Sequence, residues 1–175
     1  MTSSDVIATC SVAVALLAFF ATTWQAWLAH KHNRLSVRPF LAWHINRDSS
    51  SDGATITYSV KNLGLGPAVV KDRYFTKDGA RFATPTLATD EVSVFVSSVL
   101  ENKLRYQLRT FGLPGRGAAI PSQGEVVIGR IHFPGARTEQ LDSFEEMAGD
   151  VDFHVEYESM YQERFYFSAL HGNAA

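Results

Sequence analysis

The longest apolar stretch of the chain lies near its N-terminus. From Val6 to Leu28 the sequence VIATCSVAVALLAFFATTWQAWL runs for 23 residues without a formal charge. A helix rises about 1.5 Å per residue, so this stretch covers about 34 Å, enough for a hydrocarbon core of about 30 Å. A cleaved signal peptide would need a basic leader and small residues at the cleavage site. The leader MTSSD has no Lys or Arg. At the C-terminal end of the apolar stretch, where a signal peptide would need small residues, the chain has the bulky Trp24 and Trp27. The pattern therefore predicts a permanent transmembrane anchor within residues 1–30.

Alternation of apolar and polar residues dominates the rest of the chain and predicts strands. The clearest case is VDFHVEYE, in which Val151, Phe153, Val155 and Tyr157 alternate with charged residues and a histidine. SMYQ follows and is typical of a turn, so the last two strands are expected to form a hairpin. The predicted strands cover residues 39–47, 54–62, 68–76, 118–120, 125–133, 151–158 and 163–170.

Two segments have helical spacing instead. Thr89 and Asp90 are suitable N-cap residues, and after them apolar residues recur every three or four positions as far as Phe111. This spacing predicts a helix over about 90–111. A shorter helix is predicted over 138–148.

About seven strands with one or two helical insertions, and without regular strand–helix alternation, indicate a mainly β fold. We expect an antiparallel, immunoglobulin-like β-sandwich behind the N-terminal transmembrane helix, and a small β-barrel is the alternative. The domain organisation follows from this pattern. The anchor covers 1–30, a basic juxtamembrane linker 31–38, the β domain 39–170 and a short tail 171–175.

Composition excludes several other classes of protein. The chain has 175 residues, of which 46% are hydrophobic and 19% charged. These values exclude a disordered tail, a disulfide-rich scaffold and a polytopic membrane protein. The single cysteine, Cys10, lies within the anchor and has no partner for an intrachain disulfide. This usage is consistent with a reducing compartment for the β domain.

The charges beside the anchor predict its orientation. Lys31, Arg34 and Arg38 follow the apolar stretch, whereas no basic residue precedes it. The positive-inside rule then places the N-terminus outside the cell and the β domain in the cytoplasm. Trp24 and Trp27 are at the level where aromatic side chains meet lipid headgroups.

Small residues form a seam along the anchor, with a spacing of alternately four and three positions. Because lipid provides no hydrophobic drive for helix association, small residues matter by allowing close backbone approach, and a glutamine can hydrogen-bond across the interface. The seam predicts self-association or a partner helix in the membrane. Its members are Ser11, Ala15, Ala18, Thr22, Gln25 and Ala29.

The most distinctive motif is Asn62-Leu63-Gly64-Leu65-Gly66-Pro67-Ala68, between two predicted strands. It lacks the following helix of a dinucleotide-binding motif, so we interpret Asn62, Gly64, Gly66 and Pro67 as a structural turn. Together with Arg38-Pro39 and the single span, the motif resembles a group of small uncharacterised bacterial membrane proteins over roughly residues 5–80. The resemblance implies a bacterial inner-membrane origin and a β-rich cytoplasmic domain, and it brings no catalytic residues.

Charge is distributed unevenly. Residues 61–137 contain eleven Lys or Arg and six Asp or Glu, whereas 138–175 contain one Arg and nine Asp or Glu. Arg105, Arg109 and Arg116 lie at or near a glycine-rich loop, where guanidinium groups and backbone N–H groups are typical of phosphate recognition. A phosphate-bearing ligand is therefore one hypothesis. Pairing of the basic segment with the acidic C-terminal part, or with anionic lipid, is the other. The net charge of −2 argues against a nucleic-acid partner.

The remaining residues show no spacing typical of a catalytic or metal site. Cysteine-based zinc spacing, H-E-x-x-H, a G-x-S-x-G elbow and a Walker loop are all missing from the sequence. We expect His132 and His154 to be exposed strand residues, and the carboxylates of Glu156 and Glu158 to be solvated. The sequence thus predicts no enzyme, metal or cofactor, unless folding brings His44 and the other strand-borne histidines into one cleft.

Two functional hypotheses follow. The first is a single-pass membrane protein whose cytoplasmic β domain binds a protein partner, with the helix associating with itself or with another membrane protein. The second is a nucleotide- or anion-controlled membrane effector, which resembles bacterial defence effectors that pair a span with a small nucleotide sensor.

Overall fold

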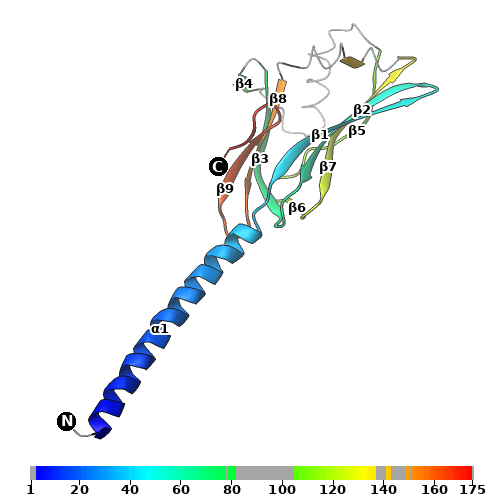
Figure 1. Cartoon of the computed structure of the whole chain (residues 1–175). Coiled ribbons are helices and arrows are strands. Elements are labelled where there is room, and N and C mark those ends of the chain that lie inside the picture. Colours follow the sequence, from blue (N-terminus) through cyan, green and yellow to red (C-terminus); the bar gives the residue numbers. More distant parts are fainter. Residues whose placement is uncertain are drawn as a thin grey trace. The chain divides into compact units, whose positions relative to one another are not determined.

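The computed structural model describes residues 3–77, 79–81, 105–136, 141–142, 149 and 151–174. The chain divides into two compact units, Met1–Ser36 and Val37–Ala175. The first unit is a single helix and the second consists mainly of antiparallel strands (Figure 1).

The first unit contains helix α1, Ser3–Ser36. At about 1.5 Å per residue it is about 51 Å long, and it is long and apolar enough to cross a membrane. Asp5 lies in its first turn and Arg34 in its last turn, where each charge complements the helix dipole. The helix continues through most of the basic segment 31–38 that the sequence predicts as a linker.

Two antiparallel sheets form the second unit, the β unit. The first sheet has the order β1-β2-β7-β5, with β1 at Leu41–Ser50, β2 at Gly53–Asn62, β7 at Glu125–Pro134 and β5 at Gln107–Phe111. The second sheet has the order β10-β9-β8-β3-β4, with β10 at Gly172–Ala174, β9 at Arg164–Ser168, β8 at Val151–Glu158, β3 at Ala68–Lys77 and β4 at Ala80–Arg81. The short strand β6, Ala119–Ile120, pairs with β3.

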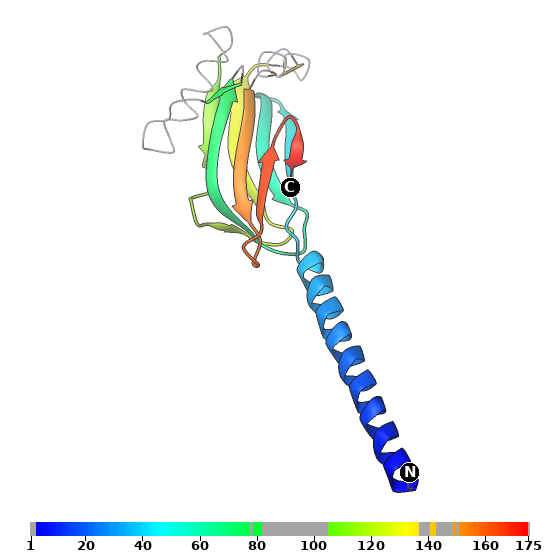
Figure 2. The ribbon, with the colours of Figure 1, turned by 90° about the vertical axis from the view of Figure 1, so that its left-hand side faces the viewer.

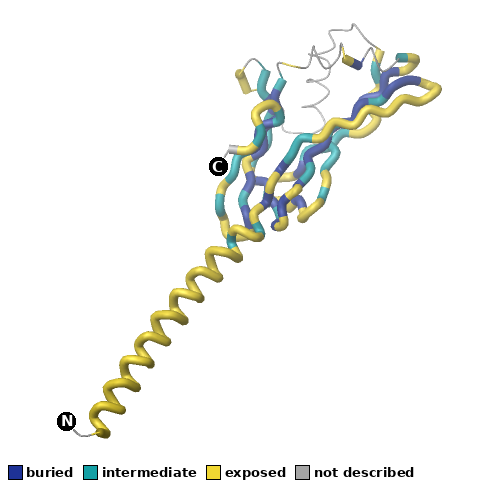
Figure 3. Tube along the Cα trace, in the orientation of Figure 1, coloured by how far each residue is buried: buried dark blue, intermediate teal, exposed yellow. Residues whose placement is uncertain are grey.

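The hydrophobic core lies between the two sheets, because each long strand presents alternate residues to the same side. Figure 3 shows that many residues of these strands are buried, and Figure 2 shows the sheet of β3, β8 and β9 in front of the other sheet. Trp43 of β1 links the layers: its ring lies 5.8 Å from Tyr58 in its own sheet and 5.8 Å from Phe153 in the other. Buried core residues include Leu41, Ile56, Val60, Val70, Phe75, Ile120, Ile131, Phe133, Val155, Tyr157 and Phe167.

The alternating pattern predicted these strands well. The segments 39–47, 54–62, 68–76, 118–120, 125–133 and 151–158 all coincide with strands, and the C-terminal hairpin is formed by β8 and β9. The residues predicted as a tail instead include β10. Asn173 holds it in place by accepting a hydrogen bond from the Tyr157 hydroxyl at 3.0 Å and donating one to the Leu41 carbonyl oxygen at 2.7 Å.

The prediction of a helix over 90–111 is wrong at its C-terminal end, where Gln107–Phe111 is strand β5. The pairing of β5 with β7 shifts register between Leu108 and Thr110. This bulge lets Leu108 and Phe111, three positions apart, both pack against the core, and so imitates helical spacing. Residues 90–104 lie outside the described residues. Of the segment 138–148 only Leu141 and Asp142 are described; both are helical, and Leu141 is buried.

Candidate functional site

Asn62 holds the turn between β2 and β3 together. Its side chain is completely buried. The Nδ2 group donates hydrogen bonds to the carbonyl oxygens of Gly66 at 2.8 Å and Ile120 at 3.1 Å, while Oδ1 accepts from the backbone N–H groups of Phe40 at 3.1 Å and Gly64 at 3.0 Å. One amide therefore joins the turn to β6 and to the segment that precedes β1.

The glycines of this turn allow its backbone to approach the start of the β unit. A Cβ atom on Gly64 would lie 2.4 Å from the Arg38 carbonyl oxygen, and one on Gly66 would lie 1.8 Å from that of Val37. The two motifs Arg38-Pro39 and Asn62–Pro67 are thus in direct contact. We assign the turn a structural role, because its side chains are used to hold the backbone.

The three arginines suggested as an anion site lie on different elements. Arg105 is exposed before β5. Arg109 of β5 belongs to the first sheet and pairs with Asp52 at 3.5 Å. Arg116 lies in the loop before β6 and pairs with Asp72 of the second sheet at 2.7 Å. Arg116 lines a hollow on the second sheet, described below, and neither Arg105 nor Arg109 lines that hollow. Two of the three guanidinium groups are therefore already paired with carboxylates, and Arg116 shares Asp72 with Arg81.

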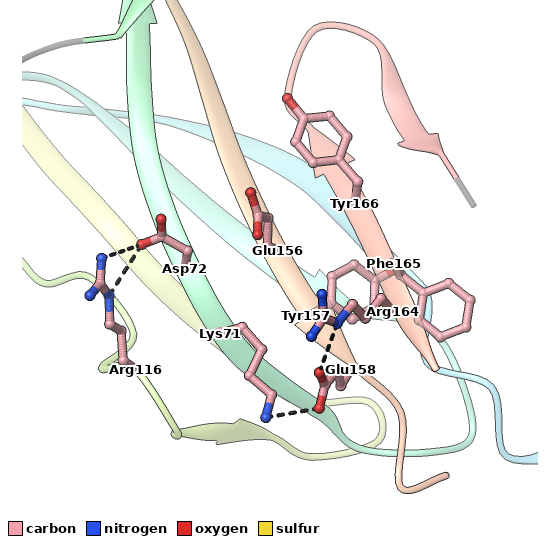
Figure 4. A pocket seen from close by; sticks show the side chains of 9 residues that line it. All are labelled: Lys71, Asp72, Arg116, Glu156, Tyr157, Glu158, Arg164, Phe165 and Tyr166. Atoms are coloured by element: carbon pink, nitrogen blue, oxygen red, sulfur yellow. Dashed lines mark hydrogen bonds and ion pairs between the residues drawn. The ribbon is translucent and has the colours of Figure 1, made fainter. Parts of the chain in front are cut away.

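The outer face of the second sheet carries a hollow of about 570 Å³ over β3, β8 and β9 (Figure 4). A bulge in β3 shapes it. The register with β8 shifts between Val70 and Asp72, so Lys71 and Asp72 both line the hollow although they are adjacent in sequence. The other lining residues are Arg116, Glu156, Tyr157, Glu158, Arg164, Phe165 and Tyr166.

We call this hollow over β3, β8 and β9 the lower hollow, and ion pairs link its charged side chains. Glu158 accepts from Lys71 Nζ at 2.8 Å and lies 3.4 Å from Arg164 Nε, and the hydrogen bond from Lys71 is the main reason that its pKa is below the ordinary value. Burial raises the pKa of Asp72, but hydrogen bonds from Arg81 and Arg116 outweigh it and bring that pKa below the ordinary value.

Glu156 occupies the middle of the lower hollow. Its carboxylate lies beside Asp72, on the side toward Tyr166, and Glu158 lies farther down the view (Figure 4). Within the described part of the chain it has no ion-pair partner, and its side chain is exposed. The hollow thus presents one unpaired carboxylate beside the two paired clusters.

A second hollow, of about 530 Å³, lies on the same face and shares Tyr166 with the first. Asp152 is at its centre and is buried. It accepts hydrogen bonds from Ser168 Oγ at 2.5 Å and from the Leu170 N–H group at 3.0 Å. His154 Nε2 and His171 Nδ1 each lie 3.5 Å from its Oδ2 atom.

His154 lies in an aromatic row that crosses three strands. Its ring stacks on Tyr74 of β3 at 4.8 Å and on Tyr166 of β9 at 5.5 Å between centroids, and Arg81 lies over the Tyr74 ring at 4.0 Å. Thr76 Oγ1 is 2.8 Å from His154 Nε2, and the Tyr166 hydroxyl is hydrogen-bonded to Nδ1.

Burial is the main cause that lowers the pKa of His154; the carboxylate of Asp152 opposes it, and His171 adds to it. Burial likewise raises the pKa of Tyr166. The ring of His154 is therefore neutral near pH 7. The expectation that His154 and His132 are exposed is wrong, because they are only 8% and 2% exposed.

This hollow contains serine, histidine and aspartate, but not in the arrangement of an activated nucleophile. Ser168 is buried and donates its hydroxyl proton to Asp152, and its Oγ also lies 3.2 Å from Nδ1 of the exposed His171, so the carboxylate contacts the serine directly instead of through the histidine. Among the described residues no group of three His, Cys, Asp or Glu side chains is placed to hold a metal ion. What the arrangement provides is a rigid polar and aromatic surface. Its residues come from β3, β8 and β9, and their spacing in the sequence does not predict that they lie close together in the fold.

The seam of small residues lies on α1. All six residues are exposed on the helix surface. Two of them satisfy their hydroxyl groups within the helix: Ser11 donates to the Ile7 carbonyl oxygen at 2.9 Å and Thr22 to that of Ala18 at 2.8 Å. Because these hydroxyl groups are hydrogen-bonded within the helix, they need no other partner, and the small side chains of the seam allow the backbone of a second helix to approach closely.

Comparison with known proteins gives no relative. No family model matches the chain, and neither a curated protein nor a solved structure matches it.

Proposed function

We propose that the chain is a single-pass, membrane-anchored interaction module whose β unit binds a protein partner. The partner-binding surface is the outer face of the second sheet, from β3 across β8 to β9. The observation that carries this proposal is the pair of adjoining hollows on that face, which share Tyr166 and are lined by hydrogen-bonded and ion-paired side chains.

The composition of this face supports a protein ligand. Tyrosine and arginine are the residue types that contribute most to protein–protein binding, and here they are held by neighbours before a partner arrives. Tyr74 and Tyr166 stack on His154, and Arg81 is fixed between Tyr74 and Asp72. Because these side chains are already ordered, a partner loses little conformational entropy in binding them.

The order of the strands supports an immunoglobulin-like sandwich. If β1, β2, β3, β5, β7, β8 and β9 are lettered A to G, the first sheet reads ABED and the second reads GFC with β4 beside C. This is the order of the constant-type immunoglobulin domain. The small barrel is disfavoured, because no strand ladder joins the two sheets among the described strands. In this fold the proposed surface is the GFC face.

The charges flanking α1 support the orientation. Lys31, Arg34 and Arg38 follow its apolar part, so the β unit lies on the cytoplasmic side and the N-terminus outside. The resemblance to small bacterial membrane proteins supports a bacterial inner membrane as the site of the anchor. The seam of α1 then brings copies of the chain together, and two β units on one assembly raise the effective concentration of binding surfaces.

Photo-crosslinking in the cells that produce the protein tests the proposal. A photoreactive amino acid replaces Glu156 in the lower hollow, and in a matched control it replaces Asn46, which is exposed on β1 of the other sheet. We expect one protein adduct of defined mass from position 156 and none from position 46. Arg164→Glu in the same chain should suppress it. Identical adducts from both positions, or none from position 156, would contradict the proposal.

A further inference from the structure

Large apolar side chains are exposed at one end of the β unit, in the connections that surround its first residue. They belong to three separate connections: the segment before β1, the β2–β3 turn and the β8–β9 turn. We call this set the apolar rim. It consists of Phe40, Leu63, Leu65, Met160 and Tyr161.

Strand pairing places these connections at the same end. Leu41 at the start of β1 pairs with Asn62 at the end of β2, and Val69 near the start of β3 pairs with Glu158 at the end of β8. The Leu63 N–H group donates to the Phe40 carbonyl oxygen at 2.7 Å. Both turns are seen at one end of the β unit in Figure 2.

The exposure of the apolar rim has no explanation in the packing of the β unit. Leu65 is 69% exposed and Met160 is 64% exposed, so neither contributes much to the core. The turn itself is held by Asn62 and the glycines, and polar residues at positions 63 and 65 would serve it equally well. Apolar side chains gathered in this way mark a surface that another apolar phase covers.

Chain connectivity identifies that phase. Ser36 ends α1, and Val37 begins the β unit without a spacer. The turn that carries Leu63 and Leu65 lies against the backbone of Val37 and Arg38. The apolar rim therefore lies around the first residues of the β unit, which follow α1 directly in the chain.

Distances along the chain agree with contact to the same bilayer. Ser36 lies eight positions beyond Leu28, the end of the apolar stretch, which is about 12 Å of helix. The headgroup layer occupies about 5–8 Å on each side of the hydrocarbon core, so the end of the helix lies within about 4–7 Å of the outer edge of that layer. Basic side chains stand at the same end of the β unit: Arg38 lies over the Phe165 ring, and Lys71 and Arg164 share the single carboxylate of Glu158, so these four charged groups together are net positive. Their charge suits an anionic membrane surface.

We propose that the apolar rim inserts into the headgroup boundary of the bilayer that α1 crosses, so that the β unit rests on the membrane. This inference rests on the proposed membrane anchor. Leucine, methionine and tyrosine suit that depth, because they bury apolar surface while the tyrosine hydroxyl stays hydrated. Contact of the apolar rim with the membrane, in addition to the helix, restricts the rotation of the β unit about its connection to the helix.

Site-directed spin labelling of the full chain tests this proposal. The protein, with Cys10→Ala to remove its only cysteine, is placed in phosphatidylcholine vesicles containing about one quarter anionic phosphatidylglycerol. A nitroxide is attached through Leu65→Cys or Met160→Cys. The matched control is Ser51→Cys, exposed in the β1–β2 turn at the opposite end of the strands. Collision rates with oxygen and with a water-soluble nickel chelate then report depth.

We expect the nickel collision rate at positions 65 and 160 to be about fivefold lower than at position 51, with a higher oxygen rate. Equal nickel rates at all three positions would overturn the proposal. Exclusion of both reagents from position 65 together with spin–spin broadening would also overturn it, since a second copy would then cover the apolar rim. A label at Leu16→Cys separates the two proposals: acyl-chain depth there keeps the anchor, whatever the apolar rim does, and a water-exposed label removes it.

Discussion

At the scale of single residues, the start of the β unit requires glycine at position 66, because every other residue type would add a Cβ atom there. Gly66→Ala would place a Cβ atom 1.8 Å from the Val37 carbonyl oxygen, and both groups are backbone-bound and unable to give way cheaply. We expect this variant to lose about 3 kcal/mol of unfolding free energy. Gly115→Ala is the matched control, because no atom lies within 4 Å of its added Cβ, and it should change stability by less than about 0.5 kcal/mol.

Urea unfolding of the full chain in detergent micelles, followed by near-ultraviolet circular dichroism, measures both glycine variants. Equal losses at Gly66 and Gly115 would mean that the contact between the turn and Val37 is not tight.

His154 gives the β unit a dependence on pH. Its pKa in the folded state is lowered from 6.5, chiefly by burial, so below about pH 6.5 the unfolded chain binds a proton that the folded chain resists. Stability from this group is complete above pH 6.5 and is lost as the pH falls toward the lowered value. Asp152, His171 and Tyr166 face the same ring and shape the curve.

We therefore expect the thermal midpoint to fall between pH 7.5 and pH 5.5, and to fall less in His154→Gln, which cannot titrate (both pH values about one unit from the ordinary pKa). Thermal scans of the two proteins at matched ionic strength provide the comparison. An unchanged slope in His154→Gln would assign the pH dependence to other groups.

The histidines also show what a residue pattern leaves open. Alternation correctly places His154 on the outward side of β8, opposite Phe153 and Val155. It does not reveal that Tyr74 and Tyr166 of neighbouring strands cover that side. Burial on a sheet surface depends on cross-strand partners, which are distant in sequence.

At the scale of elements, strands with an uninterrupted period of two were predictable, and β2 and β8 are the clearest examples. The pattern is misleading at β5, because the bulge between Leu108 and Thr110 shifts the inward positions by one. It also misses β10, whose three residues are held by pairing with β9 and not by their own propensity.

The seam of α1 makes a prediction that belongs to this scale. Ala15→Ile places a bulky, branched side chain on the seam and should weaken helix self-association in a membrane about tenfold, by blocking close backbone approach. Ala13→Ile makes the same change on the opposite side of the helix and should have little effect. Energy transfer between labelled helices of the full chain in vesicles measures both. Equal association by the two variants would contradict a role for the seam.

At the scale of the whole molecule, the sequence indicated an apolar helix followed by a mainly β unit, but not which surfaces that unit presents. The hollows on the second sheet are built from β3, β8 and β9, and β3 is separated from β8 by more than seventy residues. The three arginines illustrate the converse. They are close in sequence, yet Arg109 pairs with Asp52 in the β1–β2 turn, whereas Arg116 pairs with Asp72 on β3 of the second sheet.

We propose that a membrane-anchored β unit binds a protein partner through the outer face of its second sheet. The most direct measurement is the dissociation constant between the full chain in nanodiscs and the protein captured by crosslinking at position 156. We predict that Tyr166→Ala weakens binding by about tenfold or more, as expected for a buried aromatic contact, while Asn46→Ala on the other sheet leaves it unchanged. Equal affinity for the unaltered chain, Tyr166→Ala and Asn46→Ala would contradict the claim.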